Sequence, residues 1–257
     1  MNLRYLAAAA LVVLPLSLAQ AAGGKAPWTH EGARGPSFWG GLGYETCDTG
    51  RMQSPVDLNP MTPHASGGIT FNYKNSNVNV INNGHTVQFD YDAGSSITVN
   101  GKTFDLLQFH FHSHSEHTVK GQAYPVELHL VHKSKDGELA VVGVFIEANS
   151  GTKSDANYTT DVVFSAMPSM TGVRLTGKMQ INAADLLPHD KAYFTYKGSL
   201  TTPPCSEGVN WFVMRAPVTA NKRQMARYMS IYPSNARPVQ PWNNRAAAAA
   251  ASGHAGH

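Results

Sequence analysis

Gln108-Phe-His-Phe-His-Ser-His-Ser-Glu-His117 is the stretch of this sequence that says most about the fold. Its first half alternates polar and aromatic side chains, and in a β-strand the residues at positions i and i+2 point to the same face. Gln108, His110 and His112 therefore share one face, and the two phenylalanines between them share the other. The alternation predicts a strand with a buried aromatic face and a polar face that carries histidines.

A second stretch, Glu127-Leu-His-Leu-Val131, repeats this alternation and places Glu127, His129 and Val131 on one face. Two histidines from one strand and a third from a neighbouring strand can converge on a tetrahedral metal ion. Three protein ligands with one open position are typical of catalytic zinc rather than of structural zinc. We therefore predict a metal site formed by His110, His112 and His129.

The alternative is a set of surface histidines on a polar sheet face. Gln108 and Glu127 argue against it, because each lies two positions from a candidate ligand and on the same face. Groups that orient metal-bound imidazoles are expected at such positions. The other histidines of these stretches lack such neighbours and are predicted to be surface or packing residues: His114, His117 and His132.

Short β-prone runs separated by turn signals continue on both sides of this region. The dipeptides Asn83-Gly84 and Asn100-Gly101 are typical of tight hairpins. Helical periodicity is weak, and only residues 155–165 and 219–229 are expected to form short helices. We predict a single, mainly β domain with few short helices, built on a large, mostly antiparallel twisted central sheet. The expected strands are Ile69–Tyr73, Val78–Ile81, Thr86–Tyr91, Ser96–Val99, Leu106–His112, Val126–His132 and Leu139–Ile146.

The chain has 257 residues, of which only 14% are charged, and its formal net charge is +3. Nucleic-acid binding needs clustered lysines and arginines, which this balance does not provide, so we expect no nucleic-acid partner.

Residues 1–21 are typical of a signal peptide, because Arg4 precedes a short apolar run and Ala19-Gln-Ala21 offers a cleavage site. We expect export to the periplasm or the extracellular space, with no membrane anchor after cleavage. Residues 22–245 then form the folded domain and residues 246–257 a low-complexity, mobile tail.

Two cysteines remain in the exported chain, Cys47 and Cys205. Thiols of exported proteins tend to be oxidised, which favours a single disulfide. A pair of free structural thiols stays open as the alternative. Neither cysteine stands in a C-x-x-C arrangement, which argues against redox catalysis.

The residues around the histidines resemble those of the α-class carbonic anhydrases. The motifs that carry the resemblance follow the family's order from about Trp28 to Asn244, and they are Gln53-Ser-Pro-Val56, Asn82-Asn-Gly-His85, Gln108-Phe-His-Phe-His112, Ser115-Glu-His-Thr118, Glu127-Leu-His-Leu-Val-His132, Gly198-Ser-Leu-Thr-Thr-Pro-Pro204, Asn210-Trp211 and Asn243. The signal peptide and the cysteine pair are similar to those of exported bacterial members. One departure is Trp28-Thr-His30, where His30 takes the place of a tyrosine that often lines the family's proton pathway.

This resemblance implies an exported zinc enzyme that interconverts carbon dioxide and bicarbonate through a zinc-bound hydroxide, with residues 22–245 as its catalytic domain. His110, His112 and His129 would hold Zn²⁺. Glu116 and Thr201 resemble the pair that orients the hydroxide, and His85 matches the proton shuttle. The residues that match the substrate pocket, most of them in its apolar wall, are Val131, Val141, Leu200, Thr201, Thr202, Val209 and Trp211.

Two other functions are compatible with the sequence. One is a non-catalytic zinc-binding or recognition module on the same fold, and the other is a minor esterase activity. The intact set of ligand histidines, together with Glu116 and Thr201, favours the enzyme. The sequence does not determine the oligomeric state, and a homodimer is compatible with it.

Overall fold

Strands make up most of the regular structure in the computed structural model, which describes residues 25–59, 62–148 and 158–245. The strands are β1 (Asp57–Leu58), β2 (His64–Ser66), β3 (Ile69–Asn72), β4 (Asn75–Asn82), β5 (Val87–Asp90), β6 (Ser96–Val99), β7 (Lys102–Ser113), β8 (Thr118–Val119), β9 (Gln122–Ala123), β10 (Val126–Ser134), β11 (Leu139–Ala148), β12 (Arg174–Asn182), β13 (Ala192–Ser199), β14 (Glu207–Met214) and β15 (Val218–Ala220). The helices are α1 (Thr46–Thr49), α2 (Tyr158–Ala166) and α3 (Lys222–Ile231). Short 3₁₀ turns are η1 (Gly32–Arg34), η2 (Pro36–Phe38), η3 (Gly40–Leu42) and η4 (Ala183–Leu186).

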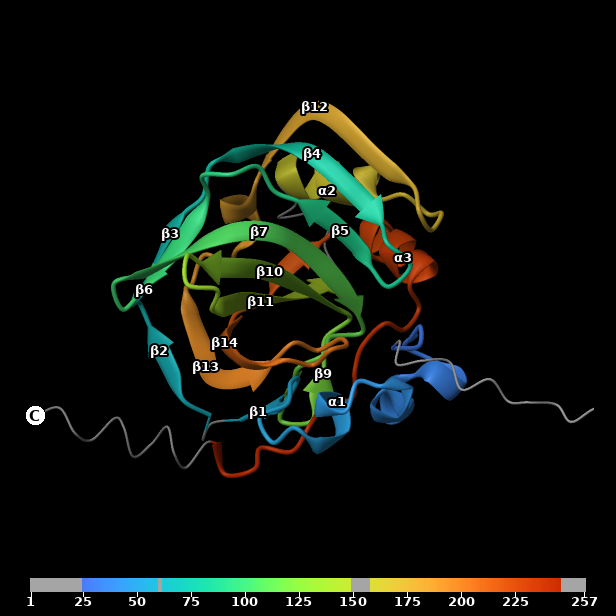
Figure 1. The fold of residues 1–257 in the computed structure, drawn as a ribbon. Helices are drawn as coiled ribbons and strands as arrows, with labels where there is room; N and C mark the ends of the chain where they lie inside the picture. Colours follow the sequence, from blue (N-terminus) through green and yellow to red (C-terminus); the bar gives the residue numbers. More distant parts are fainter. Residues whose placement is uncertain (1–24, 60–61, 149–157, 246–257) are drawn as a thin grey trace, which may run out of the picture.

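A twisted sheet of 12 strands organises the molecule (Figure 1). Its main path runs β12-β4-β5-β7-β10-β11-β14-β13-β2, and β3, β6 and β15 pair beside this path. Most neighbouring strands are antiparallel, whereas β11 runs parallel to β14 and to β15. The predicted fold class, mainly β with a large and mostly antiparallel sheet, is confirmed.

The two strands that carry the histidines, β7 and β10, are direct neighbours in this sheet. Their register places His110 opposite His129, and His112 opposite Glu127. Because side chains alternate across the pleat, the residues between them point to the other face. There they join the main hydrophobic core, which helices α2 and α3 cover: Phe109, Phe111, Leu128 and Leu130. The predicted division into an apolar face and a histidine face is confirmed.

The histidine face has a smaller apolar cluster of its own. It takes alternate residues of β11, β13 and β14, and its members include Val141, Phe145, Tyr196, Val209, Trp211 and Val213. β11 shows the division clearly, since Val142 and Val144 belong to the main core while Val141 and Phe145 belong to this second cluster. A strand buried on both faces reads as a continuous apolar run.

The predicted strands are confirmed, with their ends shifted by a few residues, as β3 to β7, β10 and β11. Among the longer strands, β12, β13 and β14 were not predicted. For β12 the reason is that all its residues from 174 to 180 are exposed and so show no apolar alternation. The predicted helix 155–165 corresponds to α2, although residues 155–157 lie outside the described part of the chain.

The predicted helix 219–229 begins too early. Thr219 belongs to β15, and α3 starts at Lys222. Asn221 sets the boundary, because its Oδ1 accepts from the Arg223 amide at 2.8 Å and its own amide donates to Gln224 Oε1 at 3.1 Å. Such a reciprocal capping box satisfies amides that the first helical turn leaves free.

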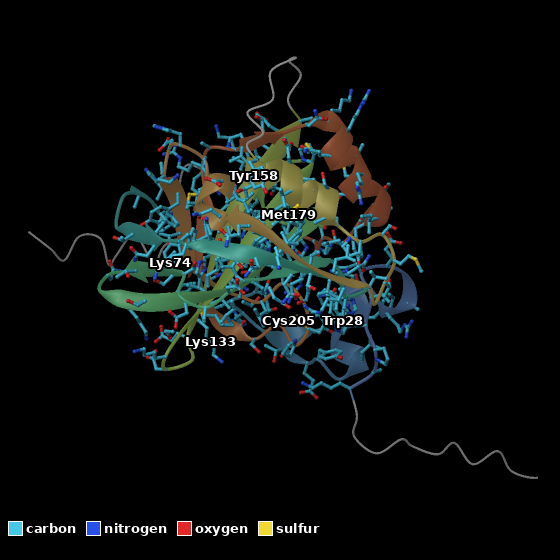
Figure 2. All side chains as sticks on the ribbon, turned by 90° about the horizontal axis from the view of Figure 1, so that it is seen from above. Trp28, Lys74, Lys133, Tyr158, Met179 and Cys205 are labelled. Carbon is cyan, nitrogen blue, oxygen red and sulfur yellow. A yellow bond between two sulfur atoms is a disulfide. The ribbon has the colours of Figure 1, made fainter. Side chains whose placement is uncertain are left out.

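The N-terminal arm is held by buried anchors rather than by the sheet. Trp39 is fully buried, and its Nε1 donates to the carbonyls of Thr29 and Arg34. Cys47 of α1 is bonded to Cys205, so the predicted disulfide is confirmed. Figure 2 shows Cys205 and Trp28 at the same end of the molecule, beside this arm.

The predicted signal peptide, residues 1–21, and the predicted tail, residues 246–257, lie outside the described residues. Within the described ranges, no helix is long and apolar enough to cross a membrane.

The disulfide generates a stability prediction. It joins residues 158 positions apart, so it restricts the unfolded chain strongly. We expect the double variant Cys47→Ser/Cys205→Ser to lose about 3–5 kcal/mol of unfolding free energy. Urea unfolding of the variant beside the oxidised wild type would measure this loss. An unchanged urea midpoint, or two titratable thiols in the oxidised wild type, would contradict the prediction.

Candidate metal centre

Three histidine side chains converge on the polar face of β7 and β10. One ring nitrogen from each of His110, His112 and His129 lies within 4.8 Å of the other two. The ring centroids are 5.1 Å apart for His110 and His112, 5.4 Å for His110 and His129, and 4.6 Å for His112 and His129. The predicted convergence is confirmed, and the cross-strand pairing of His110 with His129 is its cause.

The other ring nitrogen of each histidine has an acceptor that fixes the imidazole. His110 Nδ1 donates to Gln108 Oε1 at 2.9 Å, and His129 Nε2 donates to Glu127 Oε1 at 2.9 Å. His112 Nδ1 donates to the backbone carbonyl of Asn235 at 2.8 Å. These bonds leave His110 Nε2, His112 Nε2 and His129 Nδ1 as the ligand atoms, and they orient the rings as metal-ligating imidazoles are usually oriented.

One atom in particular indicates a metal. His112 Nε2 is buried and has no hydrogen-bond partner among the described residues. A buried polar atom of this kind needs an explanation, and a role as a metal ligand supplies one. Three imidazole nitrogens within reach of one point match the donor set of catalytic zinc.

Electrostatics favours the neutral form of all three rings. Burial is the largest influence in each case, and it lowers the pKa of His110 well below 6.5, that of His112 to about 4, and that of His129 below its usual value. Neighbouring imidazoles lower these values further. Neutral histidine is the form that binds metals, so the site is prepared for a cation.

Glu127 anchors a wider buried network. Its Oε2 accepts from the backbone amides of Glu116 and His117, and its Oε1 accepts from His117 Nδ1 at 2.7 Å. Nearby imidazoles and these hydrogen bonds hold the Glu127 pKa well below 4.5 despite the opposing effect of burial. The carboxylate is therefore ionised, and its bond to His129 fixes that ring.

His117 is more than a surface or packing residue. It is fully buried, and its Nε2 is hydrogen-bonded to the Tyr196 hydroxyl at 2.6 Å, which in turn donates to Ser54 Oγ. Its partner Tyr196 lies 79 positions away in sequence, so nothing local predicted this role. The contact of Asn235 with His112 was not predicted either, because Asn235 acts through its backbone carbonyl, a group that every residue has.

Glu116 and Thr201 are brought together from separate loops. Glu116 is buried after β7, and Thr201 is buried after β13. Glu116 Oε1 accepts from the Arg237 amide at 2.9 Å. Burial raises the Glu116 pKa to about 7, whereas His129, Arg237 and the Thr201 hydroxyl act in the opposite direction. The structure thus places the pair beside the three histidines.

The predicted substrate-pocket residues gather beside the histidines as well. Val141, Val209 and Trp211 belong to the second apolar cluster, and Val131 and Leu200 pack against it. The Trp211 ring lies 4.9 Å from the His129 ring. Thr202 lies in the turn after Thr201, where its carbonyl accepts from the Cys205 amide.

His85 lies in the turn between β4 and β5, apart from the ligand cluster. Asn83 Oδ1 accepts from its backbone amide at 2.9 Å, and its ring stacks on Trp28 at 3.8 Å between centroids. Burial lowers its pKa below 6.5. His30 lies nearby, with 6.3 Å between the two imidazole centroids.

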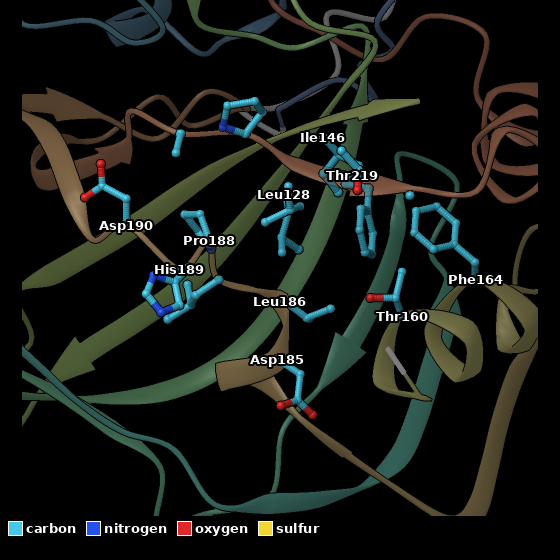
Figure 3. Close-up of a pocket in the computed structure, with 16 residues that line it drawn as sticks. Leu128, Ile146, Thr160, Phe164, Asp185, Leu186, Pro188, His189, Asp190 and Thr219 are labelled. Atoms are coloured by element: carbon cyan, nitrogen blue, oxygen red, sulfur yellow. The ribbon is translucent and has the colours of Figure 1, made fainter. Parts of the chain in front are cut away.

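A separate cavity lies on the opposite face of the sheet. It has a volume of about 390 Å³, and Phe111, Leu128 and Ile146 line it (Figure 3). Because residues alternate across the pleat, Leu128 points into it while His129 points to the metal face. The cavity is therefore not part of the histidine site.

Comparisons with known proteins identify relatives of this chain. A family model described as eukaryotic-type carbonic anhydrase matches residues 34–250. A carbonic anhydrase of Nostoc sp. is 43% identical over 226 residues, covering 85% of this chain and 84% of the relative. A carbonic anhydrase of Neisseria gonorrhoeae is 37% identical over 248 residues, covering 95% of this chain and 96% of the relative. Among solved structures, the α-carbonic anhydrase of Thermovibrio ammonificans in complex with sulfanilamide matches with a TM-score of 0.80 and 40% identity, covering 86% of this chain and 97% of that one.

The three-histidine geometry generates a metal-binding prediction. His129→Ala removes one ligand atom and leaves Glu127 Oε1 without one of its donors, so we expect the variant to lose zinc during dialysis that wild type withstands. Metal analysis after dialysis gives the zinc content per chain. The matched control is His64→Ala, which removes an exposed imidazole outside the cluster and should retain zinc. Full zinc content in His129→Ala would contradict the site.

Proposed function

Because this chain belongs to the family of eukaryotic-type, α-class carbonic anhydrases, we propose how its own residues perform the reversible hydration of carbon dioxide. The observation that carries the proposal is the set of three neutral imidazoles on one sheet face, with the His112 Nε2 atom buried and unpaired among the described residues. A non-catalytic module has no support here, since every ligand histidine is present.

His110, His112 and His129 would hold Zn²⁺, since one ring nitrogen of each lies within 4.8 Å of the other two. When bound, zinc supplies a hydroxide at neutral pH, since it lowers the pKa of its water to about 7, a general property of carbonic anhydrases as a class. The protein's contribution is a neutral ligand set. Imidazoles without charge leave the cation its full double charge, and Gln108, Glu127 and the Asn235 carbonyl keep them in place.

Thr201 and Glu116 set the direction of hydrogen bonding at the centre. The Glu116 carboxylate accepts from the Arg237 amide and faces the Thr201 hydroxyl. A hydroxyl that donates to a carboxylate offers only its lone pairs to other groups. Thr201 therefore accepts a hydrogen bond from the group at the metal position, which orients that group and discriminates against molecules that cannot donate.

The apolar wall holds the substrate. Carbon dioxide carries no charge and no hydrogen-bond donor, so a hydrophobic surface beside the metal position is a suitable place for it. Trp211 lies against His129, and its Nε1 is already satisfied by the Ser199 carbonyl at 3.0 Å. The ring therefore presents an apolar surface. The other residues proposed for this wall are Val131, Val141, Leu200 and Val209, and Thr202 is proposed as a further substrate-binding residue beside Thr201.

His85 exports the proton that each hydration releases. Its imidazole is only partly buried, and burial lowers its pKa below 6.5. Histidine is the side chain whose ordinary pKa lies nearest to neutrality, which suits it to take up and release protons. Its stacking on Trp28 and the Asn83 cap hold the ring at the end of the β4–β5 turn, away from the ligands.

We also propose that the mature protein acts in the periplasm or the extracellular space. The Cys47–Cys205 disulfide supports this, because such bonds persist in oxidising compartments. Cleavage after Ala21 would leave residues 22–245 as the catalytic domain and 246–257 as a tail, which mass analysis of the exported protein tests. A homodimer remains a proposal, and sedimentation of the mature protein tests it.

A substitution at Thr201 tests the orienting pair. Thr201→Val keeps the side-chain shape and removes the hydroxyl, so it breaks the link between Glu116 and the metal position. A hydrogen bond to a charged group contributes about 1.5–3 kcal/mol, so we expect kcat/KM for carbon dioxide hydration to fall by roughly 10- to 100-fold. Stopped-flow kinetics measures it. Thr201→Ser keeps the hydroxyl and should retain most of the activity; equal losses in both variants would contradict the assigned role.

A substitution at His85 tests proton export. In weak buffer, where proton transfer limits turnover, we expect His85→Ala to lower kcat by about tenfold or more while zinc content stays unchanged. Concentrated imidazole should restore much of the loss because it carries protons in place of the side chain. Stopped-flow hydration across a buffer series is the measurement. A wild-type kcat in weak buffer would show that His85 is not the shuttle.

A further inference from the structure

A cavity of about 310 Å³ lies where two sheets of the molecule meet. On one side is a small sheet of β1, β8 and β9, and on the other are β2, β13 and the end of β14 from the large sheet (Figure 1). The described residues that line this junction cavity come from both sheets and from the turns beside them, and they are Asn59, Val119, Lys120, His64, Phe194 and Arg215. None of them is a metal-ligating histidine, so the junction cavity is separate from the metal centre.

The lining of the junction cavity is positively charged. It contains Lys120 and Arg215 and, among the described residues, no carboxylate. No ion pair joins either cation to an acidic side chain in the part of the chain that the structure describes. His64 adds no donor while its ring is neutral, because its Nδ1 donates to the Thr62 carbonyl at 3.3 Å. The two cations therefore favour an anion in the cavity.

Arg215 is held over an aromatic ring. Its guanidinium carbon lies 5.5 Å from the ring centroid of Phe194, which is buried and belongs to the second apolar cluster. Its backbone is fixed as well, because its amide donates to the Ala192 carbonyl at 2.9 Å. A guanidinium stacked on a ring keeps N–H groups available at its edge, and these match the two oxygens of a carboxylate.

Lys120 occupies a turn whose own chemistry does not explain a lysine. Lys120 and Gly121 join β8 to β9, and both have positive φ, 52° and 77°. Asparagine, aspartate or glycine is usual at the first position of such a turn, because most other side chains are strained there. Two hydrogen bonds hold this conformation: the Lys120 amide donates to the Leu58 carbonyl at 2.8 Å, and the Gly121 amide donates to Asp57 Oδ1 at 2.7 Å. The turn therefore keeps the Lys120 side chain at the cavity.

Two walls of the junction cavity are apolar. One is the Phe194 ring, and the other is Val119, which packs against the same second apolar cluster. An inorganic anion would leave these surfaces unused, whereas an organic anion covers them. The volume of about 310 Å³ limits the occupant to a small molecule.

We propose that the junction cavity binds a small organic carboxylate. Its two oxygens pair with Arg215 and Lys120, and its apolar body packs on Phe194 and Val119. Both cations are exposed, so their pairing contributes little alone, and binding requires the charge and the apolar contact together. Neither the metal-ligating histidines nor His85 takes part.

The probe that tests this site is benzoate, which combines a carboxylate with one ring, added to the full zinc-loaded chain. Amide chemical shifts in two-dimensional nitrogen-15 NMR report binding residue by residue. We expect shifts at Val119, Lys120 and Arg215, with a Kd of about 0.1–1 mM. Benzamide has the ring without the charge, acetate has the charge without the ring, and phosphate is an inorganic anion; each should bind about tenfold more weakly.

Substitutions identify the groups that bind the carboxylate. Arg215→Gln and Lys120→Gln should each raise the benzoate Kd by about fivefold or more. Arg215→Lys keeps the charge but loses the fork and the stacking, so its Kd should lie between those of wild type and Arg215→Gln. The matched controls Arg223→Gln and Lys178→Gln remove exposed cations outside the cavity and should bind benzoate as wild type does. Amide spectra of the free variants show that each is folded.

The other outcomes overturn the inference. Absence of shifts at the cavity up to about 20 mM benzoate rejects the site. Equal affinity for benzamide shows that the charge is not recognised, and equal affinity for acetate or phosphate shows that no apolar body is recognised. Shifts confined to the metal centre, with a Kd that Arg215→Gln does not change, place benzoate at the zinc instead. Equal weakening by the two control substitutions indicates an effect of net charge alone.

Discussion

The antiparallel pairing of β7 with β10 is the constraint on which the rest of this structure depends. It places His110 opposite His129 and His112 opposite Glu127, so that three ligand atoms and one orienting carboxylate meet on one face. The same pleat sends Phe109, Phe111, Leu128 and Leu130 into the main core. A slip of one residue in this register would bury the histidines among the apolar groups and expose the phenylalanines. Folding and metal binding therefore depend on the same register.

The site also requires polar groups to be buried, which costs free energy unless each group has a partner. Hydrogen bonds from several elements provide these partners. Glu127 accepts from two backbone amides and from two imidazoles, and Arg237 donates to Cys47, Gln53 and Ser54 as well as to Glu116. Five buried side-chain atoms lack a hydrogen-bond partner among the described residues: His30 Nε2, His112 Nε2, Ser113 Oγ, Glu116 Oε2 and Arg237 Nε. Of these, His112 Nε2 lies where the metal belongs. Among the described residues, the buried polar atoms that lack a hydrogen-bond partner lie mainly at the metal site and around it.

The proton pathway depends on segments outside the sheet. Trp39 and the Cys47–Cys205 disulfide fix the N-terminal arm, and this arm supplies Trp28 and His30 to the surroundings of His85. Arg237 Nη2 donates to the Cys47 carbonyl, so the arm is tied to the same residue that donates its amide to Glu116. Stability of the arm and proton export are therefore expected to be coupled through these anchors.

The sequence by itself determined the features that repeat locally. Alternation with a period of two predicted the strands, the two faces of β7 and β10, the three ligands, and Gln108 and Glu127 beside them. Resemblance of the motifs to a known family added Glu116, Thr201 and His85, which no periodicity would have found. Tertiary structure alone decided that His117 is buried against Tyr196, that Asn235 supplies a carbonyl to His112, and that His30 is too buried to hold a proton at neutral pH. Pleating fixes where a side chain points relative to its neighbours in sequence, whereas burial and hydrogen-bond partners depend on residues that lie far away along the chain.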